Sequence, residues 1–312
     1  MGASGISILR LTFLGTSAAQ PTINRNLSAI AVKAGSDNLL FDCGEGSQRQ
    51  MIRYGTGFSV DAAFFTHFHA DHYLGIIGFL RTLGMTGRTE KLVLYGPPPA
   101  KRLLTAAVHL GVDHLAFPVE VVELKGGEAL VRGNYEVLAV QVEHRVNALG
   151  YVVKESERPG RFNLEAARAL GVTEGPDFGK LQRGEAVTTR EGALVQPEQV
   201  LGASRPGRVL VISGDTRPCQ ALVAAAKGAD LLVHEATFSD DEQERAEETR
   251  HSTAREAAKV AREAGVRRLL LTHVSSRHDV DTSKLVEQAR EEFTGPLEVA
   301  HDGLTVELPL RE

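Results

Sequence analysis

The feature that most constrains the fold is a run of metal-binding residue types directly after a short apolar segment. Residues 62–65 have the character of a strand, and they are followed by Thr66-His67-Phe68-His69-Ala70-Asp71-His72. Imidazole and carboxylate are ligands that zinc and similar divalent ions accept. In a loop, the first two histidines can face one ion while the final Asp71-His72 pair faces a second. A polar turn with unrelated histidines does not explain four such groups at this spacing.

Further candidate ligands stand singly, each at the end of another apolar run. They are His144 after residues 135–143, Asp215 after residues 208–214, and His273 after residues 268–272. Strand ends at one edge of a sheet converge on a shared cleft, where binding residues gather. Taken alone, each residue would be interpreted as a capping or hydrogen-bonding group. Beside the first cluster, we interpret all three as ligands.

The charge and composition exclude several protein classes. The chain has 312 residues and a net charge of −5, so it lacks the overall basic character of a protein whose whole surface binds nucleic acid. Any contact with nucleic acid must therefore come from local patches. Its two cysteines, Cys43 and Cys219, cannot build a disulfide framework. No apolar run reaches membrane-spanning length and no secretory signal is recognisable, so we expect a cytoplasmic protein without a membrane contact.

Strand and helix patterns alternate along the chain. Strands are predicted at residues 7–15, 28–34, 38–42, 62–65, 91–95, 119–124, 135–142, 208–212, 230–234, 268–272 and within 297–308. Helices are predicted at residues 47–53, 72–83, 101–110, 218–227, 253–264 and 283–293, with Ser252 as the cap of the fifth. Such alternation is typical of α/β layers. Two similar halves predict one domain, residues 1–312, built as a four-layer αββα sandwich.

Residues 155–200 interrupt this pattern. The segment is rich in glycine, has one short predicted helix at residues 163–170, and is too long for an ordinary loop. One interpretation is a solvated or disordered surface excursion. The other is a substrate arm, whose glycine-rich turns carry basic side chains. The candidate contact residues are Arg158, Arg161, Gly175, Pro176, Lys180 and Arg183.

With these motifs in place, the chain resembles the metallo-β-lactamase superfamily and, within it, the ribonuclease Z (tRNase Z) family in its short bacterial form. The branch-specific motifs are Phe41-Asp42-Cys43-Gly44-Glu45-Gly46-Ser47-Gln48-Arg49-Gln50, Ser213-Gly214-Asp215-Thr216-Arg217-Pro218-Cys219, His234-Glu235-Ala236-Thr237, His251-Ser252-Thr253 and the Gly175-Pro176 pair. The resemblance implies a homodimer that binds pre-tRNA. It also implies a zinc-dependent endoribonuclease that removes the 3′ trailer and leaves a 3′-hydroxyl on the tRNA.

One family motif is incomplete. The family often has Pro-x-Lys-x-Arg-Asn near the N-terminus, in a loop associated with the position of the cut. Here Pro21-Thr22-Ile23-Asn24-Arg25-Asn26 keeps the proline, arginine and asparagine but has Ile23 in place of lysine. By resemblance, Arg25 and Asn26 contact the substrate.

The resemblance also assigns roles at the cleft. It implies two Zn²⁺ ions per subunit, with Mn²⁺ or another divalent ion as the alternative. His67, His69 and His144 would hold one ion, a second set would hold the other, and Asp215 would bridge them. The second set is Asp71, His72 and His273. A metal-activated hydroxide would attack the phosphodiester, with Asp71 orienting it and accepting its proton.

The leaving 3′-oxygen also needs a proton. His251 is the candidate general acid, and Glu235 would hold its imidazole protonated and oriented. The simpler alternative for His251 is helix capping alongside Ser252.

Two other functions are compatible with the same residues. A generic zinc phosphodiesterase or arylsulfatase-like hydrolase of the superfamily would have the same active centre but no Gly-Pro arm. A non-catalytic RNA- or protein-binding member would have lost its metals, and the intact set of seven candidate ligands argues against this.

Overall fold

The computed structural model describes residues 8–111 and 114–311. It contains two compact units, Met1–Lys154 with Val209–Pro309 and Glu155–Arg208 with Leu310–Glu312. Ser7, the predicted start of the first strand, lies outside the described residues. Within the described ranges, no helix has both the length and the apolar character needed to cross a membrane.

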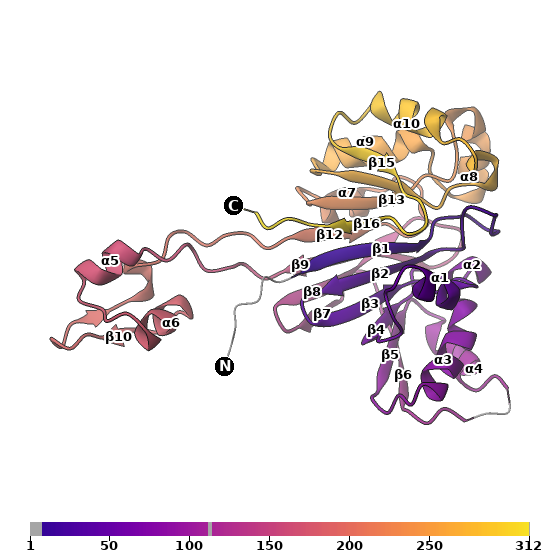
Figure 1. The fold of residues 1–312 in the computed structure, drawn as a ribbon. Coiled ribbons are helices and arrows are strands. Elements are labelled where there is room, and N and C mark those ends of the chain that lie inside the picture. Colours follow the sequence, from indigo (N-terminus) through magenta and orange to yellow (C-terminus); the bar gives the residue numbers. More distant parts are fainter. Residues whose placement is uncertain (1–7, 112–113, 312) are drawn as a thin grey trace. The chain divides into compact units, whose positions relative to one another are not determined.

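The larger unit contains two seven-stranded sheets (Figure 1). The strands of the first sheet, in spatial order, are β16 (Thr305–Glu307), β1 (Leu9–Gly15), β2 (Ala29–Ala34), β3 (Asp37–Phe41), β4 (Ala62–Phe64), β5 (Leu92–Gly96) and β6 (Val119–Glu123). Those of the second are β15 (Leu297–Val299), β14 (Leu269–Thr272), β13 (Leu231–Glu235), β12 (Val209–Ile212), β9 (Ala148–Glu155), β8 (Tyr135–Val142) and β7 (Ala129–Arg132).

Each sheet contains a parallel half. Strands β3 to β6 run parallel in the first sheet, and β12 to β15 run parallel in the second. Parallel strands covered on both faces are buried along their whole length, as β13 is. The carboxyl ends of such strands lie at one edge of the sheet, which is where α/β proteins place their binding residues.

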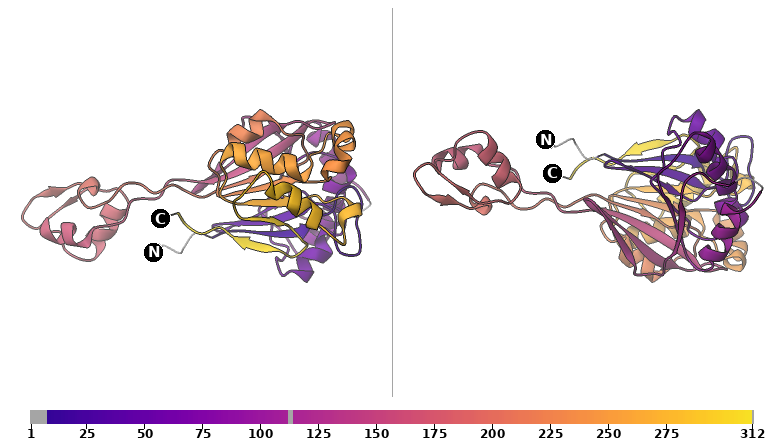
Figure 2. Two further views of the ribbon diagram at one scale, coloured as in Figure 1. Left: turned by 90° about the horizontal axis from the view of Figure 1, so that it is seen from above. Right: turned by 90° about the horizontal axis from the view of Figure 1, so that it is seen from below.

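Helices cover the outer faces of the two sheets (Figures 1 and 2). The first sheet carries α1 (Ser47–Arg53), α3 (Gly75–Met85) and α4 (Ala100–Val108), and the short α2 (Ala70–Tyr73) precedes α3. The second carries α7 (Gln220–Ala225), α9 (Ala254–Ala264) and α10 (Ser283–Arg290), and α8 (Gln243–Thr249) precedes α9. Short 3₁₀ turns are η2 (Asp240–Glu242) and η3 (Ser276–His278). The predicted αββα sandwich is therefore confirmed.

The apolar core between the sheets reaches up to the functional edge. The rings of Phe41 and Phe64 stack with centroids 5.1 Å apart, and Tyr151 from the second sheet packs edge-on against Phe64 at 5.4 Å. The Tyr151 hydroxyl donates to the Phe65 carbonyl at 2.7 Å. Because Phe65 lies two residues before His67, this bond joins the sheets directly beneath the histidine cluster.

Several local predictions were wrong. The cap of α9 is Thr253, whose hydroxyl accepts the Glu256 N–H, while Ser252 donates instead to the Thr216 carbonyl at 2.6 Å. The predicted helix at residues 72–83 divides into α2 and α3 at Leu74. Strands β7 and β9 and helix α8 were missed. Strand β7 is short and helix α8 is densely charged, and such segments carry little periodicity.

The smaller unit is folded around its own apolar core. It contains α5 (Leu164–Ala169), α6 (Pro176–Gln182), β10 (Val187–Thr188), β11 (Leu194–Val195) and η1 (Pro197–Gln199). Its buried core residues are Ala167, Val172, Leu181, Val187, Val195 and Val200. A buried ion pair joins the two ends of its main segment, residues 155–208, because Arg208 donates to Glu155 through Nε at 2.7 Å and Nη2 at 2.6 Å. The segment is thus a small folded module that extends to Arg208.

Candidate metal centre

One group of candidate ligands converges from three strand ends. It consists of His67, His69, His144 and Asp215, whose ligand atoms lie within 4.8 Å of one another. His69 Nδ1 is 3.0 Å from His67 Nε2 and 3.2 Å from His144 Nε2. A neutral imidazole carries only one N–H, so ring nitrogens that face one another cannot all take part in hydrogen bonds with each other. A divalent cation accommodates all of them, so this donor set fits a metal ion.

A second group lies against the first. Asp71, His72 and His273 also have ligand atoms within 4.8 Å of one another. Asp215 Oδ2 faces both groups, at 3.6 Å from His67 Nε2, 3.3 Å from His72 Nε2 and 3.4 Å from His273 Nε2. The partition matches the one that the sequence suggested, with Asp215 between the two sets. The ligand roles themselves stay predictions.

Gly214 explains how Asp215 reaches this position. Its φ is +62°, and a Cβ there would lie 2.9 Å from both the Leu149 carbonyl and the Thr66 Cβ. Only glycine allows the turn after β12 to approach the end of β4 so closely. The approach places Asp215 beside His67.

The outer nitrogen of four candidate ligands has a fixed partner. The contacts are His72 Nδ1 to Asp42 at 2.7 Å, His273 Nδ1 to the Thr237 hydroxyl at 2.9 Å, His144 Nδ1 to the Arg250 carbonyl at 2.9 Å, and His67 Nδ1 to the Thr66 hydroxyl at 3.0 Å. Such partners select the tautomer and hold the ring in place. Sequence reasoning missed these partners, although Asp42 stood inside a quoted motif at the end of a predicted strand.

The electrostatics of the first group favour metal binding. Burial lowers the pKa of His67, His69 and His144, which keeps their imidazoles neutral as metal ligation requires. Burial alone would raise the pKa of Asp215, but the surrounding imidazoles, His273 foremost, hold it well below its ordinary value. The group therefore offers neutral nitrogens and a carboxylate anion near neutral pH.

Backbone strain is concentrated at this centre. The non-glycine residues with positive φ in the described ranges are Ala19, Asp42, Arg250 and His273, at 56° to 61°. His273 is itself a candidate ligand, and each of the others bonds to one. The three bonds join the Ala19 N–H to Asp71 at 2.8 Å, Asp42 to His72, and the Arg250 carbonyl to His144. Left-handed residues with a side chain are costly and cluster at functional sites.

His251 and Glu235 form a hydrogen-bonded pair beside the two groups. Nδ1 of His251 is 2.8 Å from Glu235 Oε1 and 3.8 Å from Asp215 Oδ2. Glu235 is buried and accepts bonds from the Thr216 N–H and the Thr237 hydroxyl. Burial opposes the charged imidazole, but Glu235 outweighs it and raises the pKa of His251 to about 9. The arrangement leaves Nε2 of a protonated imidazole available as a donor.

The loop at residues 21–26 is anchored beside the cleft. Asp279 accepts hydrogen bonds from the Thr22 hydroxyl at 2.7 Å and from the Asn24 side chain at 2.9 Å. Arg25 is only 7% exposed, and its guanidinium donates to the Thr16 hydroxyl at 2.8 Å and the Ala300 carbonyl at 2.6 Å. Asn26 donates to the Glu45 carbonyl at 3.0 Å. Both side chains are thus engaged within the protein, and their contact with substrate stays a prediction.

The candidate residues of the smaller unit are mostly paired within it. Lys180 bonds to Asp177 and Arg183 to Glu185, each at 2.9 Å. Arg158 donates to the Arg311 carbonyl at 2.5 Å. Gly175, with φ of 124°, precedes Pro176, the first residue of α6. Among the residues that the structure describes here, the exposed Arg161 and Arg190 have no side-chain partner, and Arg190 had not been predicted.

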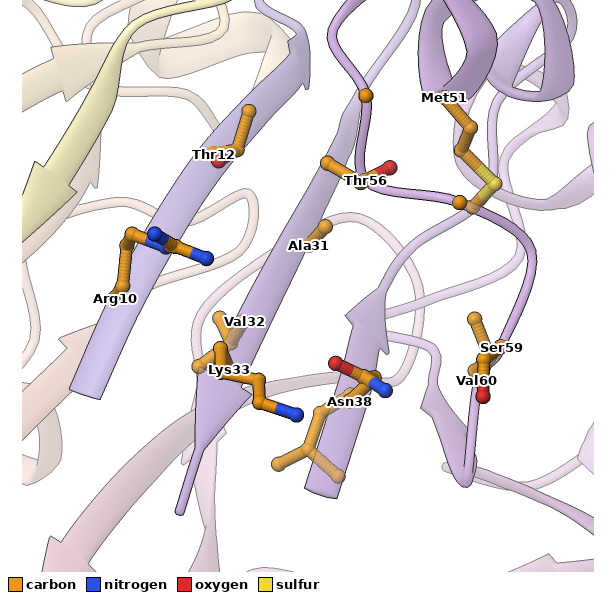
Figure 3. Close-up of a pocket in the computed structure, with 13 residues that line it drawn as sticks. Arg10, Thr12, Ala31, Val32, Lys33, Asn38, Met51, Thr56, Ser59 and Val60 are labelled. Atoms are coloured by element: carbon orange, nitrogen blue, oxygen red, sulfur yellow. The ribbon is translucent and has the colours of Figure 1, made fainter. Parts of the chain in front are cut away.

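A separate hollow of about 100 Å³ lies on the outer face of the first sheet (Figure 3). Arg10 and Lys33 face each other there from β1 and β2, and Lys33 donates to the Ser36 carbonyl at 2.8 Å. None of the predicted site residues lines this hollow. It therefore supplies control positions for experiments on the cleft.

Comparison with known proteins decides the family. A model described as "Beta-lactamase superfamily domain" matches residues 184–274, and one described as "Anti-Pycsar protein Apyc1" matches residues 9–152. Ribonuclease Z of Myxococcus xanthus is 76% identical over 98% of this chain and 100% of its own length. The chain belongs to the ribonuclease Z family. Ribonuclease Z of Haloferax volcanii is 52% identical, with coverage of 96% and 95%. The resemblance inferred from the motifs is confirmed.

Solved structures agree on the fold. The short form of human tRNase Z superposes with a TM-score of 0.69 at 24% identity, covering 96% of this chain and 100% of that one. The metallo-β-lactamase fold protein YhfI of Bacillus subtilis gives 0.70 at 20% identity, covering 96% and 99%. At these identities the likeness supports the metallo-β-lactamase fold alone.

Proposed function

We propose that this member of the ribonuclease Z family, an endoribonuclease that hydrolyses phosphodiester bonds, removes the 3′ trailer from pre-tRNA in the cytoplasm with two Zn²⁺ ions per subunit. The observation that carries the proposal is the convergence of two ligand groups on Asp215, with the His251–Glu235 pair beside them. The ions fit the donors, which are imidazoles and carboxylates. Mn²⁺ or another divalent ion is the alternative.

The proposed metal ligands fall into two sets that share Asp215. His67, His69 and His144 would hold one ion, and Asp71, His72 and His273 the other. When bound, such a pair of ions supplies charge neutralisation at the phosphoryl group and a water of lowered pKa. The outer partners described above fix the donor atoms before any ion arrives, which reduces the cost of ordering the site.

Two residues are proposed to move protons. Asp71 has one carboxylate oxygen held by the Ala19 N–H at 2.8 Å, so its orientation is set by the backbone. We assign it the role of orienting the attacking water and accepting its proton. His251 gives a proton to the departing ribose 3′-oxygen, because Glu235 keeps its imidazole charged. The product is a tRNA with a 3′-hydroxyl and a trailer with a 5′-phosphate.

The test is incubation with a pre-tRNA that carries a 3′ trailer, followed by mapping of both product ends. We expect a tRNA 3′-hydroxyl and a trailer 5′-phosphate, with activity lost on chelation and restored by Zn²⁺. Bis(p-nitrophenyl) phosphate serves as a small substrate on the same preparation. Hydrolysis of this diester without any pre-tRNA cleavage would favour the generic phosphodiesterase.

We assign to residues 155–208 the role of an arm that binds pre-tRNA. The arm is an insertion in a single catalytic domain. Phosphate contacts need cations without stable acidic partners. Arg161 and Arg190 meet that condition, whereas Lys180 and Arg183 would have to exchange exposed ion pairs, which are weak. Substituting glutamate for Arg161 and Arg190 together should therefore weaken pre-tRNA binding. The same double substitution at Arg10 and Lys33, on the outer sheet face, should weaken it less. Equal effects would reject the assignment.

The homodimer is a further part of the proposal. It rests on the family resemblance, in which an arm on one subunit contacts tRNA bound at the other. Light scattering on the purified protein tests it directly. A monomeric mass at the concentrations used in the activity assays would reject the dimer. It would not bear on the reaction proposed for the cleft.

A further inference from the structure

Arg250 occupies a backbone position that suits glycine. It follows α8 and precedes His251, and its φ is +60°. Residues with a Cβ are disfavoured in this left-handed conformation, and helices that end this way usually have glycine there. Helix α9 ends in the same manner and does have glycine, Gly265, at φ of +63°. The arginine at the end of α8 therefore needs a reason of its own.

The backbone at this point is held without help from the Arg250 side chain. Its carbonyl accepts from His144 Nδ1 at 2.9 Å, and the next N–H, that of His251, donates to the Ala246 carbonyl at 2.8 Å. The His251 carbonyl accepts from Arg217 Nη1 at 2.7 Å, and Arg217 is itself paired with Glu256. Glycine at position 250 would keep all these bonds and relieve the unfavourable conformation.

The guanidinium of Arg250 is exposed in an acidic stretch, yet the described residues include no ion-pair or hydrogen-bond partner for it. The nearby arginines are engaged. Arg255 bonds to Asp240 at 2.6 Å, Arg277 lies 3.4 Å from Glu242, and Arg217 is paired with Glu256. The carboxylates of this stretch are those of Asp240, Asp241, Glu242, Glu244, Glu247 and Glu248. Arg250 is thus an unneutralised cation one residue from the candidate general acid.

We propose that Arg250 is a substrate-binding residue that contacts an RNA phosphodiester next to the scissile one. Its backbone carbonyl bonds to a candidate metal ligand, so the side chain starts at the rim of the cleft. Guanidinium is suited to phosphate because its planar N–H groups match two phosphate oxygens. The inference rests on the proposed function, since it assumes a polynucleotide substrate whose chain continues past the cut.

A comparison of three proteins distinguishes a phosphate-binding Arg250 from an arginine that is only a solvated surface charge. Arg250→Gly removes the cation and relieves the backbone, Arg250→Lys keeps the charge in the same backbone, and the wild type is the reference. The measurement is kcat/KM for pre-tRNA across a series of salt concentrations. Metal content and thermal unfolding are recorded for each protein.

Arg250→Gly should lower kcat/KM for pre-tRNA several-fold at low salt and flatten the logarithmic salt dependence by about 0.7 to 0.9, the slope of one phosphate contact. Arg250→Lys should keep most of the slope. The glycine variant should unfold at the same or a higher temperature, since its backbone is relieved. Its loss on bis(p-nitrophenyl) phosphate should be much smaller than on pre-tRNA.

An unchanged salt slope in Arg250→Gly would overturn the proposal, and so would a loss of equal size on both substrates. A wild-type protein that does not cleave pre-tRNA at all would instead reject the proposed function. The two failures are therefore distinguishable within one set of assays.

Discussion

The metal cleft and the smaller unit differ in how their functional side chains are held. In the cleft, His67, His72 and Asp215 are at most 3% exposed, and each is bonded or packed against another site residue. In the smaller unit, Lys180 and Arg183 are exposed and their ion pairs are open to water. A buried network fixes geometry before the substrate arrives, whereas exposed pairs can exchange for phosphate at little cost.

The difference indicates what each region contributes. Bond cleavage requires groups positioned within a fraction of an ångström, and the strained residues at the cleft show that the fold tolerates unfavourable backbone to achieve it. Capture of a large polyanion tolerates variation in contact geometry. We therefore expect substitutions in the cleft to act on the rate of chemistry, and substitutions in the smaller unit to act on binding.

The largest expected effect comes from Asp215→Ala. The substitution removes the carboxylate that faces both ligand groups, so metal content and activity should fall together, the latter by several orders of magnitude. The strands should persist, because the core lies between the sheets. Metal analysis, circular dichroism and both hydrolysis assays check this, with Glu120→Ala in an exposed ion pair as the control. Near-normal cleavage with full metal content would reject the bridging role.

His251→Ala should have the next largest effect. A missing general acid typically costs roughly 10²–10⁴-fold in rate. Metal content should be unchanged, because the proposed ligand sets do not include His251. Nitrophenolate leaves without a proton, so bis(p-nitrophenyl) phosphate should lose much less activity than pre-tRNA. Equal losses on the two substrates would leave His251 a structural residue.

Replacing residues 155–208 with a glycine-serine linker tests the other side of the comparison. Both ends must be removed together, since removing only one would break the buried ion pair between Glu155 and Arg208. The remaining protein should bind its metals and hydrolyse the small diester. Pre-tRNA affinity should drop by on the order of 10²-fold at low salt, because several phosphate contacts disappear at once. Gel-shift titrations at two salt concentrations measure it, and an unchanged affinity would revive the generic phosphodiesterase.

The contrast also explains how much the sequence could predict. The seven candidate ligands, the first of which is His67 and the last His273, stand at the ends of predicted strands. Because strand ends at one sheet edge converge, these residues could be assigned to one site without a structure. The αββα layers followed from the same alternation. Asp42 could not be assigned, because its contact with His72 depends on the pairing of Phe41 with Phe64, which brings β3 beside β4.

The smaller unit was less predictable for a physical reason. Its core consists of a few small residues from short elements, which leave almost no periodic signal. The sequence located its cations but not their partners, so Lys180 and Arg183 were selected while Arg190 was overlooked. The left-handed backbone of Arg250 was equally invisible, because an exposed arginine after a charged helix has no distinctive pattern.

Asp42→Asn sharpens the account of the cleft. The amide keeps the shape but loses the charge that faces His72 Nδ1 at 2.7 Å. Losing such an outer partner typically costs about 10–100-fold in metal affinity or activity. Zinc titration against a competing chelator measures the affinity, and activity at saturating metal should recover in part. The exposed Asp281→Asn is a control, and an unaltered affinity in Asp42→Asn would show that Asp42 only stabilises the fold.

The smallest effect should be a displacement of the pH profile in Glu235→Gln. His251 must be protonated to act as an acid, so activity should be retained below its pKa and lost as pH rises through it. Glu235 is the principal group that raises that pKa to about 9. Removing its charge lowers the pKa, so the basic limb of kcat/KM for pre-tRNA should move to lower pH. The profile on bis(p-nitrophenyl) phosphate should keep its basic limb, because that leaving group needs no proton. If the basic limb moved for both substrates, the titrating group would be a residue of the cleft other than His251. If the limb did not move for pre-tRNA, Glu235 would have no role in proton transfer.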